Sequence, residues 1–146
     1  MKWELKSFSE LFTFLPKSKI KAGEGKEEGK YPFFTCSSVL DKYYDDKIYS
    51  GECLVFGTGG NATLHYINGD FATSTDCFVV RSSSSGILVK YVYYFLFGNI
   101  SILEEGFKGS GLKHISKSYL NSIQIPIPPL DIQRKIINTL DKVLLL

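Results

Sequence analysis

Residues 125–137, IPIPPLDIQRKII, join a proline-rich run to the start of an apolar repeat. Proline fixes φ and lacks an N–H donor, so Pro126 suits an edge strand and Pro129 suits the first turn of a helix. Asp131 then lies at the positive end of the helix dipole. The stretch therefore predicts a strand that ends at a rigid hinge and is followed by a long helix.

An apolar stripe continues beyond the hinge at spacings of three and four residues. Its members are Ile132, Ile136, Ile137, Leu140, Val143 and Leu144. The sequence ends on three leucines without a polar cap, so we expect this helix to be cut short or to need a partner. We predict that the stripe binds another protein or a second copy of the chain, because burying such a side chain is worth about 1.5–3 kcal/mol.

Length and composition are those of one folded domain. The chain has 146 residues, 14% of them aromatic, and a mean hydropathy of zero, which excludes a disordered chain. It contains no apolar run of about 18 residues, and its three cysteines form no CxxC pair. We therefore expect a cytoplasmic protein with reduced thiols, without membrane association and without a metal site.

Positive charge is distributed unevenly along the chain. The net charge of +2 is too small to indicate a nucleic-acid-binding protein by itself. However, the interval between Glu105 and Asp131 contains no acidic residue. Basic side chains in this interval are Lys108, Lys113, His114 and Lys117, and a second basic cluster contains Lys17, Lys19 and Lys21. These two segments are the candidates for contact with an anionic partner.

The pattern of apolar residues and turn formers predicts an α+β fold, with a small, twisted, mostly antiparallel sheet, a packed helix and a C-terminal spacer helix of the coiled-coil type. We expect a helical or mixed segment before Pro16, a solvated loop over 17–30 and a hairpin turn at Asn68-Gly69. Strands are expected at 31–36, 53–56, 62–67, 77–80 and 100–103. Helices are expected at 86–97 and at 116–120, the latter with Ser116 as its N-cap.

Fragments of enzyme motifs do not assemble into an active site. Residues 57–62, GTGGNA, fit the GxGxxA of dinucleotide-binding proteins, but residues 63–69 form helices poorly, and a helix is required there. Thr58 also breaks the FxGxG of methyltransferases, and the sequence contains no [DN]PP[YFW] motif. The EGK triplets lack the preceding aspartate of a nuclease site. We therefore expect no catalytic residues and no cofactor.

Two longer stretches carry a family resemblance. Residues 57–80, GTGGNATLHYINGDFATSTDCFVV, and residues 106–136, GFKGSGLKHISKSYLNSIQIPIPPLDIQRKI, resemble a target recognition domain of the specificity (S) subunit of type I restriction-modification systems. The resemblance implies a recognition domain over 1–128 and the start of a conserved spacer or dimerisation helix over 129–146. It also implies a non-catalytic subunit with two such domains, which binds double-stranded DNA and docks methyltransferase (M) and restriction (R) subunits. Whether the chain is a natural half-subunit, a truncated product or a fragment stays open.

The candidate DNA contacts combine positive charge with short polar side chains near glycines, because phosphates attract lysine and base edges pair with amides and hydroxyls. They are Lys17, Lys19, Lys21, Ser37, Ser38, Thr58, Asn61, Thr63, Ser74, Thr75, Lys108, Ser110, Lys113 and His114. Two alternatives remain: the recognition portion of a single-chain restriction-methyltransferase enzyme, and a protein-interaction domain whose glycine loops bind a peptide. The sequence does not disclose the DNA target.

Overall fold

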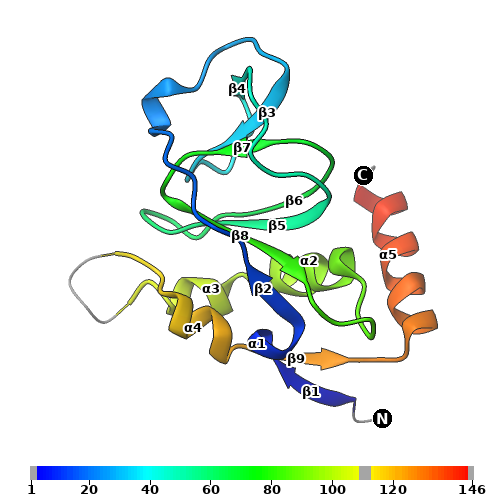
Figure 1. Cartoon of the computed structure of the whole chain (residues 1–146). Helices are drawn as coiled ribbons and strands as arrows, with labels where there is room; N and C mark the ends of the chain where they lie inside the picture. Colours follow the sequence, from blue (N-terminus) through cyan, green and yellow to red (C-terminus); the bar gives the residue numbers. More distant parts are fainter. Residues whose placement is uncertain (1–2, 109–112, 145–146) are drawn as a thin grey trace.

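The computed structural model of the chain describes residues 3–108 and 113–144 (Figure 1). The strands are β1 (Glu4–Ser7), β2 (Phe12–Phe14), β3 (Tyr31–Phe34), β4 (Tyr43–Tyr44), β5 (Glu52–Gly57), β6 (Leu64–Asn68), β7 (Ala72–Thr73), β8 (Cys77–Ser82) and β9 (Gln124–Ile127). The helices are α1 (Phe8–Leu11), the short 3-10 helix η1 (Ala22–Glu24), α2 (Val89–Gly98), α3 (Ser101–Glu105), α4 (Lys117–Ser122) and α5 (Leu130–Leu144). This is the α+β class that the sequence predicts.

The strands form three sheets that are mostly antiparallel, as expected. The central sheet has the order β2-β8-β5-β6, and all of its neighbours are antiparallel. Above it in Figure 1 lies the sheet β4-β3-β7, in which β3 and β7 run parallel. At the bottom of the view, β1 pairs with β9, and Pro126 lies opposite Leu5. Both strands of this two-stranded sheet are edge strands, as the sequence predicts for Pro126.

The central sheet is buried on both faces, which explains why β5 and β8 read as continuous apolar runs. Successive side chains of a strand point to opposite faces. Leu54 and Phe56 accordingly join the main core, which lies against α1, α2, α4 and β9. Cys53 and Val55 point the other way and pack with Phe34, at the end of β3, in a second core. The upper sheet is therefore held to the central sheet by apolar packing.

Two predictions about local structure are wrong. Residues 100–103 do not form a strand: they enter α3, which satisfies the need to bury Leu103 while Ser101 and Glu104 stay exposed. Asn68-Gly69 is not the turn of a hairpin, because antiparallel pairing continues past it. Gly51 and Gly69 exchange backbone hydrogen bonds of 3.0 and 3.1 Å. The glycine run after β5 is instead the loop of the β5–β6 hairpin.

The proline hinge and the long helix are confirmed. Helix α5 begins at Leu130 and carries Asp131 in its first turn. Its inner face packs on α2, where Asp141 forms a salt bridge of 2.9 Å with Lys90 and accepts a hydrogen bond from the Tyr94 hydroxyl. Figure 1 shows α5 upright at the right of the molecule, beside α2. No helix in the described part of the chain is long and apolar enough to cross a membrane.

Candidate nucleic-acid interface

The glycine-rich loop between β5 and β6 is anchored at its base by Thr58. The backbone N–H and the hydroxyl of Thr58 both donate to the Asp76 carbonyl, at 3.0 and 2.9 Å. In return the Thr58 carbonyl accepts the N–H of Ile115, at 3.0 Å, and lies 3.1 Å from Nδ1 of His114. Gly60 has a φ of +78°, which favours glycine at the tip. The loop is therefore tied both to the start of β8 and to the segment after residue 112.

A second loop, residues 35–38, lies directly on the base of the glycine loop. A Cβ built on Gly57 would lie 2.2 Å from the Thr63 hydroxyl oxygen and 3.1 Å from Cα of Cys36, so only glycine allows this approach. His65 donates from Nε2 to the Ser37 carbonyl, at 2.9 Å. Ser37 and Ser38 stay exposed beyond this contact. The two loops thus present short polar side chains next to one another.

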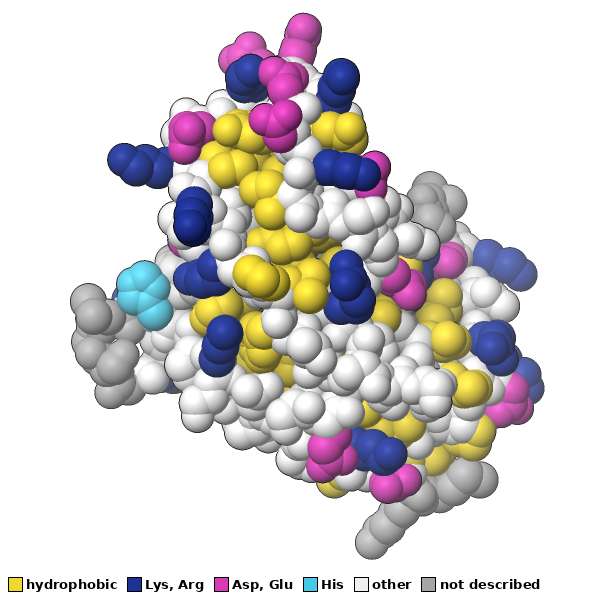
Figure 2. Space-filling model, in the orientation of Figure 1, with side chains coloured by type: hydrophobic (Ala, Val, Ile, Leu, Met, Phe, Trp, Pro, Cys, Tyr) yellow, Lys and Arg dark blue, Asp and Glu magenta, His cyan; other side chains and the backbone are white. Residues whose placement is uncertain are grey.

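The two basic segments are joined by a pair of phenylalanines. Nζ of Lys17 lies 5.0 Å from the centroid of the Phe78 ring, and Nζ of Lys117 lies 5.1 Å from that of Phe14. The two rings pack edge to face with centroids 5.4 Å apart, because β2 pairs with β8. Figure 2 shows lysine and arginine side chains in a row down the left of the molecule, interleaved with hydrophobic ones and beside a histidine.

The predicted contact residues divide by exposure. Exposed are Lys17, Lys19, Lys21, Ser37, Ser38, Asn61, Thr75, Lys108, Lys113 and His114. Thr58, Thr63 and Ser74 are buried, which removes them from direct contact with a base, and Ser110 lies outside the described residues. The Thr75 N–H donates to the Ile20 carbonyl, at 2.7 Å, so the first basic segment lies against the start of β8.

Lys108 differs from the other predicted cationic contacts. Its Nζ lies 2.9 Å from a carboxylate oxygen of Glu105, one helical turn earlier, and this hydrogen bond raises the pKa of Lys108. Its charge is therefore partly neutralised within the chain. Among the ion pairs of the described residues, none includes Lys17, Lys19, Lys21, Lys113 or Lys117. The expectation that Lys108 faces a phosphate stays a prediction.

Comparison with known proteins decides the family. Residues 1–145 match the model of the type I restriction modification DNA specificity domain. The chain belongs to this family. It is 28% identical over 144 residues to the type I restriction enzyme EcoDI specificity subunit of Escherichia coli, covering 97% of this chain and 31% of that subunit. The MjaVIII specificity subunit of Methanocaldococcus jannaschii is 24% identical, with 92% and 34% covered. The prediction of a non-catalytic specificity component agrees with these relatives.

Solved structures share the fold of this specificity domain. The S subunit of a type I restriction-modification system from M. genitalium has a TM-score of 0.77 at 18% identity, covering 98% of this chain and 40% of that one. The specificity subunit from Thermoanaerobacter tengcongensis has a TM-score of 0.63 at 17% identity, with 97% and 37% covered. The domain spans about a third of the length of the curated relatives it matches.

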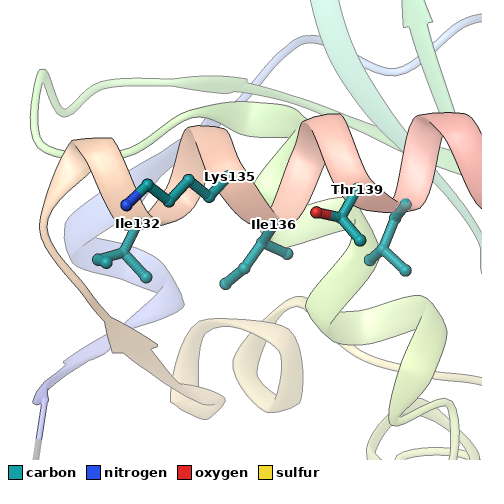
Figure 3. Close-up of a pocket in the computed structure, with 5 residues that line it drawn as sticks. Ile132, Lys135, Ile136 and Thr139 are labelled. Atoms are coloured by element: carbon teal, nitrogen blue, oxygen red, sulfur yellow. The ribbon is translucent and has the colours of Figure 1, made fainter.

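The specificity domain also carries an apolar groove along α5. The groove, of about 360 Å³, is lined by Ile132, Lys135, Ile136, Thr139 and Leu140. In Figure 3 the side chains of Ile132, Ile136 and Thr139 project from the same side of the helix. Val143 and Leu144, of the same predicted stripe, are 70% and 44% exposed. Ile136 and Ile137 both pack partly against the main core, and Ile137 does not line the groove.

The residues that sequence reasoning missed are the ones that join or hold distant segments. Phe14 and Phe78 carry no sequence signal beyond that of core residues, yet their rings lie beneath two lysine ammonium groups. Gln133 belongs to no predicted site, although it is fully buried at the hinge. Neither role has a local sequence signal, because each depends on a partner more than 40 residues away along the chain.

Proposed function

We propose that this chain recognises a specific sequence in double-stranded DNA without catalysing a reaction on it. In doing so it would position the methyltransferase and restriction subunits of a type I restriction-modification system in the cytoplasm. The division into a recognition domain over 1–128 and a spacer helix over 129–146 is part of the proposal. Membership of the DNA specificity family supports the role in DNA recognition. The loops and basic segments described above support the assignment of particular residues to phosphates and to bases.

The observation that carries the proposal is the basic surface formed by Lys17, Phe78, Phe14 and Lys117. Two lysine segments about 100 residues apart in sequence meet there without acidic partners among the described residues. Phosphate contacts of this kind position a protein on the duplex, whereas base contacts specify the sequence. We therefore assign Lys17, Lys19, Lys21, Lys113 and Lys117 to phosphates.

Base contacts are assigned to the loops beside this surface. Asn61, Ser37, Ser38 and Thr75 are exposed, and the loops that carry them are tied to one another through Thr58, Asp76 and His65. Asparagine can pair with two positions of adenine, and serine or threonine with several bases. Thr58 hydrogen-bonds within the protein, so we assign it to holding the loop in place.

A salt titration tests both assignments. The chain, assembled with its methyltransferase partner, is titrated with a fluorescent duplex that contains the target identified by mapping methylated sites. Replacing Lys17 and Lys117 with alanine should weaken binding to target and unrelated DNA alike, and should lower the slope of log K against log salt by about 0.9 for each phosphate that the variant no longer neutralises. Replacing Asn61 with alanine should change the preferred sequence and leave the slope as it was.

Lys47 provides a matched control. It pairs with Asp70 at 3.5 Å, and its loop between β4 and β5 lies on the right of the upper sheet in Figure 1, away from the 17–24 segment. Lys47→Ala should leave affinity and slope unchanged. If the double lysine variant behaves like this control, the DNA-facing surface lies elsewhere. A chain that binds a peptide with little dependence on salt would favour the protein-interaction alternative.

We also propose that the groove of α5 receives a second copy of the same helix. Ile132, Ile136, Thr139 and Val143 follow the alternating spacing of four and three residues that is typical of a coiled-coil seam. The first three of these side chains line the groove, and Val143 is exposed beyond it. Asp141, on the opposite face of α5, contacts α2. A self-complementary stripe of this kind is what a two-fold dimer requires.

Sedimentation equilibrium tests the dimer. Replacing Ile132 and Leu140 with glutamine should weaken association by about tenfold or more, because each side chain contributes about 1.5–3 kcal/mol when buried. Asn138→Ala is the control, since Asn138 is exposed and does not line the groove. An intact chain that stays monomeric at all concentrations, or a glutamine variant that associates normally, contradicts the dimer. If only binding to the methyltransferase weakens, the groove belongs to that subunit.

A further inference from the structure

Three side chains that can bind a metal meet beneath the glycine-rich loop. Cys36 follows β3, and Asp76 and Cys77 lie at the start of β8, 40 residues further on. Their ligand atoms all lie within 4.8 Å of one another. Cys77 is fully buried, whereas Cys36 and Asp76 are partly exposed, so the cluster can be reached from solvent. The proposed DNA contacts do not use these three side chains.

We propose that Cys36, Asp76 and Cys77 form a binding site for one zinc ion. Zinc takes tetrahedral sets of thiolate and carboxylate ligands, and Zn–S bonds of about 2.3 Å place two sulfur ligands about 3.8 Å apart. The present spacing therefore needs side-chain adjustments of only about 1 Å. The fourth position, on the side of the two partly exposed residues, is left for a water molecule.

Both thiols are held in place by backbone carbonyls. Sγ of Cys36 donates to the Asp76 carbonyl at 3.2 Å, and Sγ of Cys77 donates to the Phe34 carbonyl at 3.8 Å. Zinc binding would displace both thiol protons, because only thiolates coordinate zinc strongly.

Outer hydrogen bonds hold the ligands in place. The Ser74 hydroxyl donates to one carboxylate oxygen of Asp76 and leaves the other available. Thr58 fixes the backbone of Asp76 through two hydrogen bonds to its carbonyl. Partners of this kind orient metal ligands and are part of a functional metal site.

A second observation points to the same place. The Thr63 hydroxyl is buried and has no hydrogen-bond partner among the described residues. The Thr63 hydroxyl oxygen and Sγ of Cys36 both lie close to Gly57. A Cβ built on Gly57 would be 2.2 Å from the hydroxyl oxygen and 3.3 Å from Sγ. Buried hydroxyls are normally paired, so an unpaired one needs an explanation. A zinc-bound water would supply its partner.

A bound zinc ion would clamp together three loops. Cys36 precedes Ser37 and Ser38, Asp76 follows Thr75, and Asp76 also anchors the loop that carries Asn61. Binding to the folded state alone stabilises it in proportion to the logarithm of metal concentration. This role does not depend on DNA binding, so the zinc site and the proposed function can fail separately.

Zinc titration of the reduced, chelator-treated full chain tests the site. In competition with a chromophoric chelator the chain should bind one equivalent of zinc, and zinc should raise its unfolding temperature. Cobalt(II) in place of zinc should give a thiolate charge-transfer absorption. Cys36→Ser and Asp76→Asn should lose the binding, the absorption and the temperature shift. Cys53→Ala should retain them, because Cys53 is a buried thiol outside the cluster.

Three results would overturn the proposal. The first is zinc binding by Cys36→Ser equal to that of the unchanged chain. The second is loss of binding in Cys53→Ala while that variant remains folded by circular dichroism. The third is a reduced chain that binds no zinc but forms a disulfide between Cys36 and Cys77. The oxidant in that experiment is a low-molecular-weight disulfide, which is itself reduced to two thiols. That outcome would make the cluster a redox pair.

Discussion

At the scale of the residue, Gln133 explains why the proline hinge has a defined direction. All three hydrogen bonds of its amide go to backbone groups: the oxygen accepts the Leu88 N–H at 2.8 Å, and the nitrogen donates to the carbonyls of Gly86 and Pro128 at 3.0 and 2.9 Å. The side chain is fully buried. It thereby ties the hinge and the first turn of α5 to the segment that enters α2.

Replacing Gln133 with leucine should destabilise the chain. The variant leaves one N–H and two carbonyls without partners, and each buried unpaired group costs about 1–3 kcal/mol. Urea unfolding followed by circular dichroism measures the effect as a lower midpoint. Gln124→Leu is the control, because Gln124 lies exposed in β9. Equal midpoints and slopes for the two variants would contradict this role.

At the scale of the element, α5 is held to α2 by a small polar cluster. Asp141 accepts a hydrogen bond from Tyr94 and pairs with Lys90. The Tyr94 hydrogen bond, followed by the Lys90 hydrogen bond, holds the pKa of Asp141 below its usual value. The folded state therefore favours the carboxylate, and this stabilisation is present above the unfolded pKa of about 3.9.

The contribution of Asp141 should disappear at low pH. It is lost as pH falls through the lowered pKa of the folded state, because the protonated group no longer pairs with Lys90. The difference in unfolding temperature between the unchanged chain and Asp141→Asn should therefore be largest near neutral pH and shrink below about pH 4. Glu27→Gln, at an exposed position, serves as the control. A difference that is constant from pH 7 to the acid range would refute the assignment.

At the scale of the whole molecule, the candidate interface is assembled from segments far apart in sequence. Pairing of β2 with β8 brings Phe14 and Phe78 together, and Lys117 and Lys17 lie over these two rings. The glycine loop, the 35–38 loop and the start of β8 meet beside it. Helix α5, which carries the groove, lies on the right in Figure 1, whereas the 17–24 segment lies on the left.

The isolated chain should transfer no methyl group and cleave no DNA. The sequence contains neither a methyltransferase motif nor a complete nuclease motif, and its family is that of the specificity component. Incubation with a labelled methyl donor and plasmid DNA, with and without the co-encoded methyltransferase, measures this directly. Methylation by the chain alone, after contaminating methyltransferase has been excluded, would contradict the assignment.

The sequence by itself determined the features that depend on neighbouring residues. Pro126 and Pro129 predict the hinge and the start of α5 because they act on their own backbone. Ser116 predicts the start of α4, and its side chain accepts the N–H of Tyr119 at 3.0 Å. The family could also be predicted from the sequence, because its motifs are contiguous stretches of residues.

Only the tertiary structure decided the features that depend on distant residues. Residues 101–105 form a helix that buries Leu103 and packs Ile102 partly against the main core. The glycine run forms the hairpin loop because β5 pairs with β6 on either side of it. Thr58 and Thr63 look like contact residues in sequence but are buried. Whether a polar side chain faces solvent is set by what packs over it. The segments that bury such a side chain are distant in sequence, so local residue preferences do not reveal them.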